Sequence, residues 1–162
     1  MHSRLLSTLN FQLTALLLIA AAAPAVAQTT SPIRHVAHVT IVVRDQDEAL
    51  KFYVDKLGFE KREDRTWGGF RWLTVAPPGQ TDLDIVLEKP GGEMGPARQQ
   101  QLAAQIGQAP SWGFDTADVQ AAYETLKSRG VHFDEPPQKL PYGIQAVFRD
   151  LYGNSFALVQ RR

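Results

Sequence analysis

Residues 35–63 read HVAHVTIVVRDQDEALKFYVDKLGFEKRE, and this stretch predicts a strand, a helix and a second strand in that order. Its first part, His35–Val43, is rich in β-branched residues, which favour strands. Asp45, with a glutamate three positions later, matches the capping box that satisfies free N–H groups at a helix start. The next apolar residues share one helical face and are Leu50, Tyr53, Val54 and Leu57. Gly58 permits the left-handed backbone that ends a helix, and Phe59–Glu63 follows as a strand.

Two more strands complete this first unit. Arg71–Ala76 and Leu83–Glu88 both have strand patterns, and the turn sequence Pro77-Pro78-Gly79 separates them. Residues 35–90 are therefore predicted to form a βαβββ module.

The second half of the chain repeats this order with little sequence identity. A strand is expected at Trp112–Thr116, then a helix that Asp118 caps and Gly130 ends. The remaining strands are expected at Val131–Phe133, Ile144–Arg149 and Ser155–Gln160. The predicted fold class is α+β, with two tandem βαβββ modules that bury their apolar faces together.

These modules, 35–90 and 110–160, are expected to form one domain over residues 33–162. The linker 91–109 is rich in glycine at its start, and Pro96–Ile106 could form a short helix because proline is favoured in a first helical turn.

The N-terminal residues have the pattern of a signal peptide. The run Leu13–Ala23 is almost wholly apolar, and Ala25-Val26-Ala27 supplies the small residues that a signal peptidase recognises. We expect cleavage before Gln28, which removes residues 1–27 and leaves a secreted or periplasmic protein with no membrane segment. An uncleaved membrane anchor is the alternative, although the run is short for a helix of about 20 residues.

Composition excludes several classes of function. The chain has 17 Lys and Arg against 17 Asp and Glu, so it lacks the excess positive charge of a nucleic-acid-binding surface. It has no cysteine, which excludes disulfides, thiolate metal sites and a cysteine nucleophile. It also has no nucleophile elbow, phosphate-binding glycine loop or dinucleotide fingerprint. The expected partner is therefore a small molecule.

Motifs at both ends of the predicted domain resemble one known family. The segments His38–Ile41, Asp45–Tyr53 and Leu57–Phe59 resemble the opening of the vicinal oxygen chelate superfamily, and Ala146–Asp150 with Gly153–Gln160 resembles its ending. That superfamily includes glyoxalase I, extradiol dioxygenases and the bleomycin and fosfomycin resistance proteins. The resemblance implies paired modules that form an open cup of mixed β-sheet with flanking helices, a divalent metal in the cup, and a homodimer.

The resemblance also places the family's metal ligands, and few are present. His38 falls at the first-strand ligand, and Glu88 is the only carboxylate near the end of the first module's last strand. Ser111 and Ala157 stand where the second module often has ligating side chains. A Zn, Ni, Mn or Fe site usually needs at least three protein ligands, so the expectation is no cofactor. One divalent metal held by His38 and Glu88 is the alternative.

The expected ligand pocket lies on the His38 face of the sheets. Its predicted lining is Thr40, Trp72, Thr74, Ser111, Tyr142 and Phe148. Tyr142 could equally be an ordinary loop tyrosine, and the hairpin tip Trp67–Phe70 could form a flap or lie against the sheet. Trp112 and Phe114 are interpreted as core beneath the second helix rather than as ligand-stacking residues.

Two functions fit this sequence best, and a third, looser option is an interaction domain that uses its sheet edge for dimerisation. One is a glyoxalase-type lyase or isomerase that acts on a small carbonyl compound, with a metal that polarises the carbonyl and Glu88 as ligand or general base. The other is a non-catalytic protein that sequesters an apolar or aromatic small molecule, for which a concave apolar pocket is sufficient. No catalytic residue could be assigned, so whether the protein is an enzyme stays open.

Overall fold

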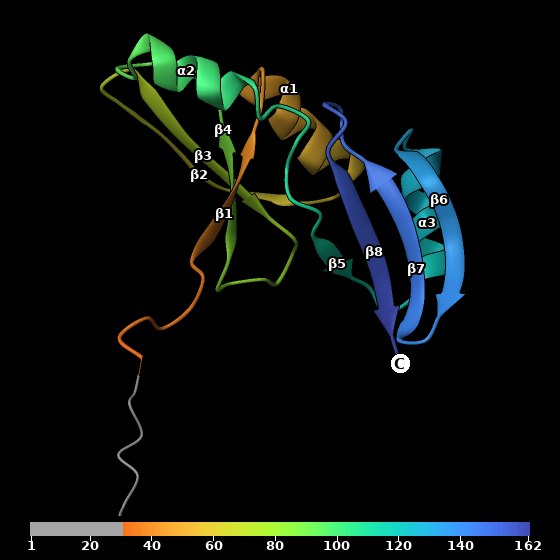
Figure 1. Cartoon of the computed structure of the whole chain (residues 1–162). Coiled ribbons are helices and arrows are strands. Elements are labelled where there is room, and N and C mark those ends of the chain that lie inside the picture. The colour runs from red at the N-terminus through yellow and green to blue at the C-terminus, as the bar shows by residue number, and fades with distance from the viewer. Residues whose placement is uncertain (1–30) are drawn as a thin grey trace, which may run out of the picture. The chain divides into compact units, whose positions relative to one another are not determined.

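Two βαβββ modules follow one another in the computed structural model, which describes residues 31–162 (Figure 1). The first module contains β1 (His38–Val42), α1 (Gln46–Lys51), a π-helix η1 (Phe52–Lys56), β2 (Glu60–Trp67), β3 (Phe70–Ala76) and β4 (Asp84–Glu88). The second contains β5 (Gly113–Asp115), α3 (Val119–Ser128), β6 (His132–Leu140), β7 (Gly143–Arg149) and β8 (Ser155–Arg161). The linker carries α2 (Pro96–Ala103). The predicted signal peptide, 1–27, lies outside the described residues.

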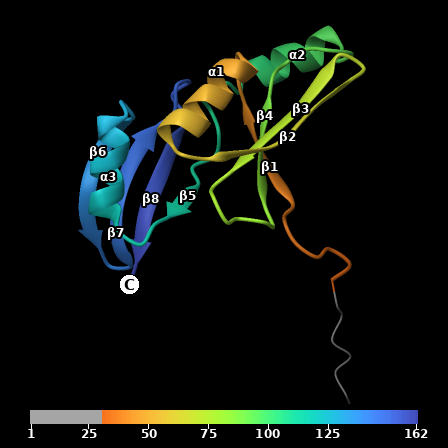
Figure 2. The same ribbon diagram turned by 180° about the vertical axis from the view of Figure 1, so that it is seen from behind.

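Each module has a four-stranded mixed sheet of the same topology. The strand orders are β1-β4-β3-β2 and β5-β8-β7-β6. The first strand of each module pairs in parallel with the last, and the other pairs are antiparallel. Figures 1 and 2 show α3 lying against one face of the second sheet. The predicted α+β fold of tandem modules is confirmed. Within residues 31–162, no helix has the length and apolar character needed to cross a membrane.

The helices of the two modules begin and end as predicted, whereas α2 ends at Ala103 rather than at Ile106. Asp45 Oδ1 accepts hydrogen bonds from the backbone N–H groups of Asp47 (2.9 Å) and Glu48 (3.1 Å), and Asp118 Oδ1 accepts one from Ala121 (3.0 Å). Gly58 follows the first helical segment with a φ of 77°, a left-handed conformation that glycine adopts without strain. The second half of the first predicted helix is π-helical rather than α-helical.

The capping box at Asp45 is only half formed. The backbone N–H of Asp45 donates to the hydroxyl of Tyr152 (2.9 Å), and that hydroxyl donates to the carbonyl of Asp45 (2.8 Å). Tyr152 therefore takes the place of the glutamate side chain that the capping box would use. This contact joins the start of α1 to the β7–β8 turn of the other module.

The apolar faces of both modules form one core. Fully buried residues of the first sheet, Ile41 and Leu73 among them, belong to the same cluster as Phe148 and Phe156 of the second. The rings of Phe59 and Phe114 meet across the modules with centroids 5.5 Å apart. Burial of these aromatic and branched side chains is the main source of stability for the pair of modules.

Two hairpin strands extend well beyond their predicted ends. β2 runs to Trp67 instead of Glu63, and β6 runs to Leu140 instead of Phe133. Both are outer strands of their sheets, and β6 contains Pro136 and Pro137 with register shifts on both sides of Glu135. Edge strands accept charged residues, prolines and bulges that an inner strand would not, so the strand pattern is weak in the sequence.

Candidate functional site

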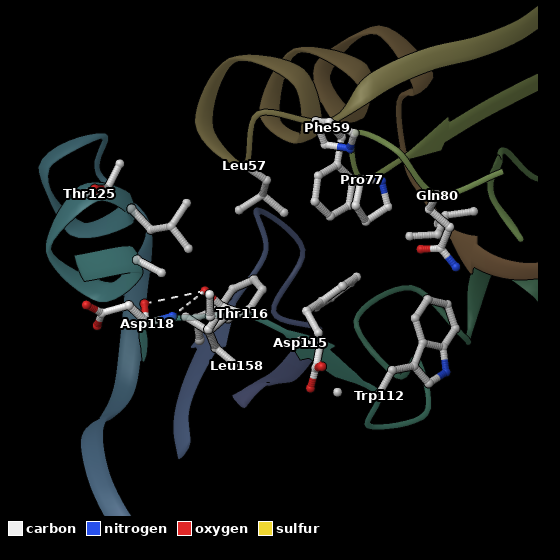
Figure 3. A pocket seen from close by; sticks show the side chains of 18 of the residues that line it. Leu57, Phe59, Pro77, Gln80, Trp112, Asp115, Thr116, Asp118, Thr125 and Leu158 are labelled. Carbon is white, nitrogen blue, oxygen red and sulfur yellow. Dashed lines mark hydrogen bonds between the residues drawn. The ribbon is translucent and has the colours of Figure 1, made fainter. Parts of the chain in front are cut away.

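A cavity of about 820 Å³ lies between the modules, on the helix-facing side of both sheets (Figure 3). The first module contributes side chains after η1, such as Leu57 and Phe59, and the β3–β4 loop with Pro77 and Gln80. The second module contributes β5, the exposed start of α3 and one face of that helix. The cavity therefore exists only because the two modules stand side by side.

The walls of this inter-module pocket are mostly apolar. Phe114 contacts Phe59 (5.5 Å between ring centroids) and Phe148 (6.0 Å), so an aromatic cluster forms one wall. Leu126 on α3 and Leu57 after η1 form another part of the lining. An apolar pocket with a few polar groups is the usual form of a small-molecule site.

Most polar groups in the pocket already have partners. Asp118 caps α3, and the Thr125 hydroxyl donates to the carbonyl of Ala121 (2.8 Å). Asp115 forms an ion pair with Arg161 (3.0 Å). The side-chain amide of Gln80, on the opposite side of the pocket from Trp112 in Figure 3, makes no hydrogen bond within residues 31–162. Gln80 is thus able to donate to a ligand or accept from one.

Five of the predicted site residues share the other face of the first sheet, namely His38, Thr40, Trp72, Thr74 and Glu88. His38 and Thr40 pair with Asp84 and Val86, whereas the alternate residue Val39 lines the inter-module pocket. Trp72 lies on the His38 face, and its ring meets the His38 imidazole edge to face at 5.5 Å. Thr74, opposite Val86, has no exposed surface. The structure brings these residues together on one face, where His38 is exposed, Thr40 and Trp72 are half-buried and Thr74 is buried.

The residues on this face do not fit a divalent metal site. Glu88 pairs with Val42, four positions along β1 from His38. At about 3.3 Å per residue, the two side chains are separated by roughly 13 Å along the sheet. No cluster of three His, Asp or Glu residues occurs in the part of the chain that the structure describes. Ser111 and Ala157 supply no imidazole or carboxylate, so the second module adds no strong ligand for a divalent metal.

Phe148 requires a correction, because the prediction placed it on the same face as Trp72 and Thr74. In the structure Phe148 pairs with Phe156 and is buried in the helix-facing core. The residue of β7 that matches Thr74 of β3 is Val147, which lies opposite Ala157. The predicted alignment of β7 with β3 was wrong by one residue. A shift of one residue along a strand moves every side chain to the opposite face of the sheet. Phe148 lines the inter-module pocket instead.

Ser111 and Tyr142 lie away from the inter-module pocket. Ser111 is exposed just before β5. Tyr142, in the β6–β7 turn, is 54% exposed, and its hydroxyl donates to Gln145 Oε1 (2.9 Å). Trp67, at the β2–β3 hairpin tip, is also exposed and contacts Phe70 with ring centroids 5.9 Å apart.

Sequence reasoning missed the pocket formed by Leu57, Phe59 and α3. Trp112 and Phe114 are packed against the core as predicted, yet both also line the pocket. The helical periodicity and the strand alternation mark all of these residues as inward-facing. Neither pattern shows that the two inward faces leave a space between them.

Comparison with known proteins agrees with this architecture. Residues 35–158 match the profile of the Glyoxalase/Bleomycin resistance protein/Dioxygenase superfamily. The protein YurT of Bacillus subtilis (strain 168) is 40% identical over 122 residues, which span 75% of this chain and 95% of YurT.

Solved structures of similar proteins extend the comparison. UcmS2 has a TM-score of 0.70 at 40% identity, covering 78% of this chain and 98% of its own. TnmS3, an antibiotic binding protein from Streptomyces sp. CB03234, has a TM-score of 0.68 at 34% identity and covers 82% of this chain and 100% of its own. With both βαβββ modules inside the matched range, this chain belongs to the Glyoxalase/Bleomycin resistance protein/Dioxygenase superfamily, the vicinal oxygen chelate group that its end motifs resemble.

Proposed function

We propose that this protein binds an apolar or aromatic small molecule in the inter-module pocket without transforming it. The observation that carries the proposal is the lining of the 820 Å³ cavity, in which Phe59, Phe114 and Leu126 surround a space with few free polar groups. Ligand pockets are typically about 300–1,000 Å³ and mostly apolar. A drug-sized molecule would be largely removed from water there, and burial of apolar area is the main favourable term in such binding.

The chemistry of the walls supports an aromatic ligand. The Phe59 and Phe114 rings already meet in a T-shaped arrangement, and a flat aromatic ligand can add further edge or face contacts of the same kind. The Gln80 amide can fix the orientation of such a ligand through one polar group. The likeness to TnmS3, an antibiotic binding protein, supports a small-molecule ligand.

We propose that this binding requires no metal. The carboxylates near the pocket have structural partners, since Asp118 caps α3 and Asp115 pairs with Arg161. His38 and Glu88, the candidate metal ligands, lie on the other face of the first sheet and far apart along it. A binding protein therefore accounts for the pocket better than a metal-dependent lyase does.

We also propose that the protein is exported and works as a homodimer. Export rests on the signal-peptide pattern that ends at Ala27, and pairing rests on the family resemblance. N-terminal sequencing of the mature protein, expected to begin at Gln28, and its mass in solution test these two points.

A pocket-filling variant tests the proposed function. Ala121 lies on α3 and lines the pocket, so Ala121→Trp should fill the cavity and weaken binding of the neutral dye phenylnaphthylamine by at least about tenfold. Gln120→Trp is the matched control, because Gln120 is next to Ala121 in the sequence but is exposed and does not line the pocket. Dye titration monitored by fluorescence gives both dissociation constants. Absence of dye binding to the unmodified protein, or equal binding by both variants, would contradict the proposal.

A further inference from the structure

A second cleft, of about 620 Å³, shares one residue with the inter-module pocket. Arg129, the residue that follows α3, lines both cavities. The second cleft lies among α1, η1 and the ends of β6 and β7, and basic side chains predominate in its lining. The basic residues are Lys51, Lys56, Arg129, His132 and Arg149, and the acidic residues are Glu48, Asp55 and Asp150.

Several of these charges are already neutralised. Arg149 forms an ion pair with Asp134 (2.7 Å), and His132 Nε2 lies 3.3 Å from the same carboxylate. The Asp150 carboxylate is buried and accepts a hydrogen bond from the Tyr53 hydroxyl (2.8 Å). The other basic residues of the second cleft are Lys51 on α1, Lys56 on η1 and Arg129 after α3.

Arg129 and Lys56 carry positive charge without a carboxylate partner. Within residues 31–162, neither forms a salt bridge. Arg129 Nη1 donates to the carbonyl of Lys56 (3.1 Å), and Lys56 Nζ donates to the carbonyl of Gly130 (3.3 Å). A guanidinium has five N–H donors, so this single bond leaves most of the Arg129 donors for another acceptor.

The position of Arg129 places this charge at one end of an apolar space. A Cβ atom added to Gly58 would lie 3.5 Å from Arg129 Nη1, so the guanidinium lies beside the Leu57–Phe59 segment that lines the pocket. Asp118 lies at the other end of α3, roughly 16 Å away at about 1.5 Å per residue. The inter-module pocket therefore has the Asp118 carboxylate near one end and the Arg129 guanidinium, which has no carboxylate partner within residues 31–162, near the other. The walls between these two groups are mostly apolar.

We propose that the natural ligand is an elongated apolar or aromatic carboxylic acid, with its carboxylate bound to Arg129. This inference rests on the proposed function and names the ligand class more closely. A guanidinium binds a carboxylate with two parallel hydrogen bonds, and such charge-assisted bonds are stronger than neutral ones. The apolar body of the ligand would then contact Leu57, Phe59 and Leu126.

Two probes that differ only at the acidic group test this inference. Pyrenebutyrate and pyrenebutanol have the same aromatic body, so their affinity ratio isolates the contribution of the carboxylate. We expect the full-length mature protein to bind pyrenebutyrate about tenfold more tightly, as a charge-assisted hydrogen bond implies. Arg129→Gln should remove this preference, so that pyrenebutyrate binds to the variant no more tightly than pyrenebutanol does. Arg129→Lys should restore part of it because the charge is kept.

Lys127→Gln is the matched control, since Lys127 lies two positions before Arg129, carries the same charge and lines neither cavity. Thermal melting of each variant shows that it is folded. Equal affinities for the two probes in the unmodified protein would overturn the inference and leave the proposed function intact. A preference that survives Arg129→Gln would also overturn it. Failure of both probes to bind would contradict the proposed function itself.

Discussion

At the scale of single residues, the buried Asp150 carboxylate joins the two modules. This carboxylate accepts hydrogen bonds from the Tyr53 hydroxyl (2.8 Å), the Tyr152 and Asn154 backbone N–H groups (2.9 Å each) and the Asn154 side-chain amide (2.7 Å). Burial, and then the neighbouring carboxylate, raises the pKa of Tyr53 well above its ordinary value, so Tyr53 stays a protonated donor. Tyr53 belongs to η1 and Asp150 to the β7–β8 turn, so this bond crosses from one module to the other.

Tyr53→Phe should destabilise the protein by about 1–3 kcal/mol, because the buried Asp150 carboxylate then loses the hydrogen bond that the Tyr53 hydroxyl donates to Oδ2. Urea unfolding measures the change in free energy. Tyr142→Phe is the control, since that hydroxyl is exposed and bonds only to Gln145. Its effect should stay within about 0.5 kcal/mol, as for other surface changes. Equal effects of the two substitutions would show that the bond to Asp150 adds nothing.

At the scale of elements, Arg71 holds the outer hairpin strand and the first helix together. The Arg71 guanidinium donates to both Asp64 oxygens on β2 (2.8 and 2.9 Å) and to Asp47 on α1 (2.7 Å). The hydrogen bonds from Arg71 lower the pKa of Asp64 from its ordinary value of 3.8 to about 2. A carboxylate with a lowered pKa stabilises the folded state above its ordinary pKa, and this contribution is lost as pH falls through the folded value.

Arg71→Gln should therefore lower stability most above pH 4, and the difference from the unmodified protein should shrink as pH falls from about 4 to about 2. Because both side chains are about a quarter exposed, solvent screening should hold the loss to about 1 kcal/mol. Thermal melting across this pH range measures it. Arg65→Gln is the control, since Arg65 is exposed and contacts only Glu63 at 3.7 Å. A pH-independent loss would mean that Arg71 acts by packing alone.

The elements that could be predicted have strong local signals. The caps at Asp45 and Asp118, and the glycines at positions 58 and 130, mark the helix boundaries through contacts that are local in the sequence. The long edge strands β2 and β6 could not be bounded, because their residues are polar and gain strand structure only from pairing with β3 and β7.

At the scale of the whole molecule, the sequence predicted the two modules but not the space between them. Alternation along β1 separated His38 and Thr40 from Val39 and Ile41 correctly. The position of Phe148 was wrong, because a repeat with little identity does not fix the register between β3 and β7. A cavity depends on how two faces fit together, and Leu57 and Phe114 have the same local pattern as residues that are packed without a gap.

A small molecule that binds between the modules, and not on the His38 face, should contact the residues that line the inter-module pocket. Intermolecular nuclear Overhauser effects between phenylnaphthylamine and isotope-labelled protein test it most directly. We predict contacts from the dye to the methyl groups of Leu57 and Leu126, which line the inter-module pocket. Contacts confined to the methyl groups of Thr40 and Thr74, on the His38 face, would contradict this account.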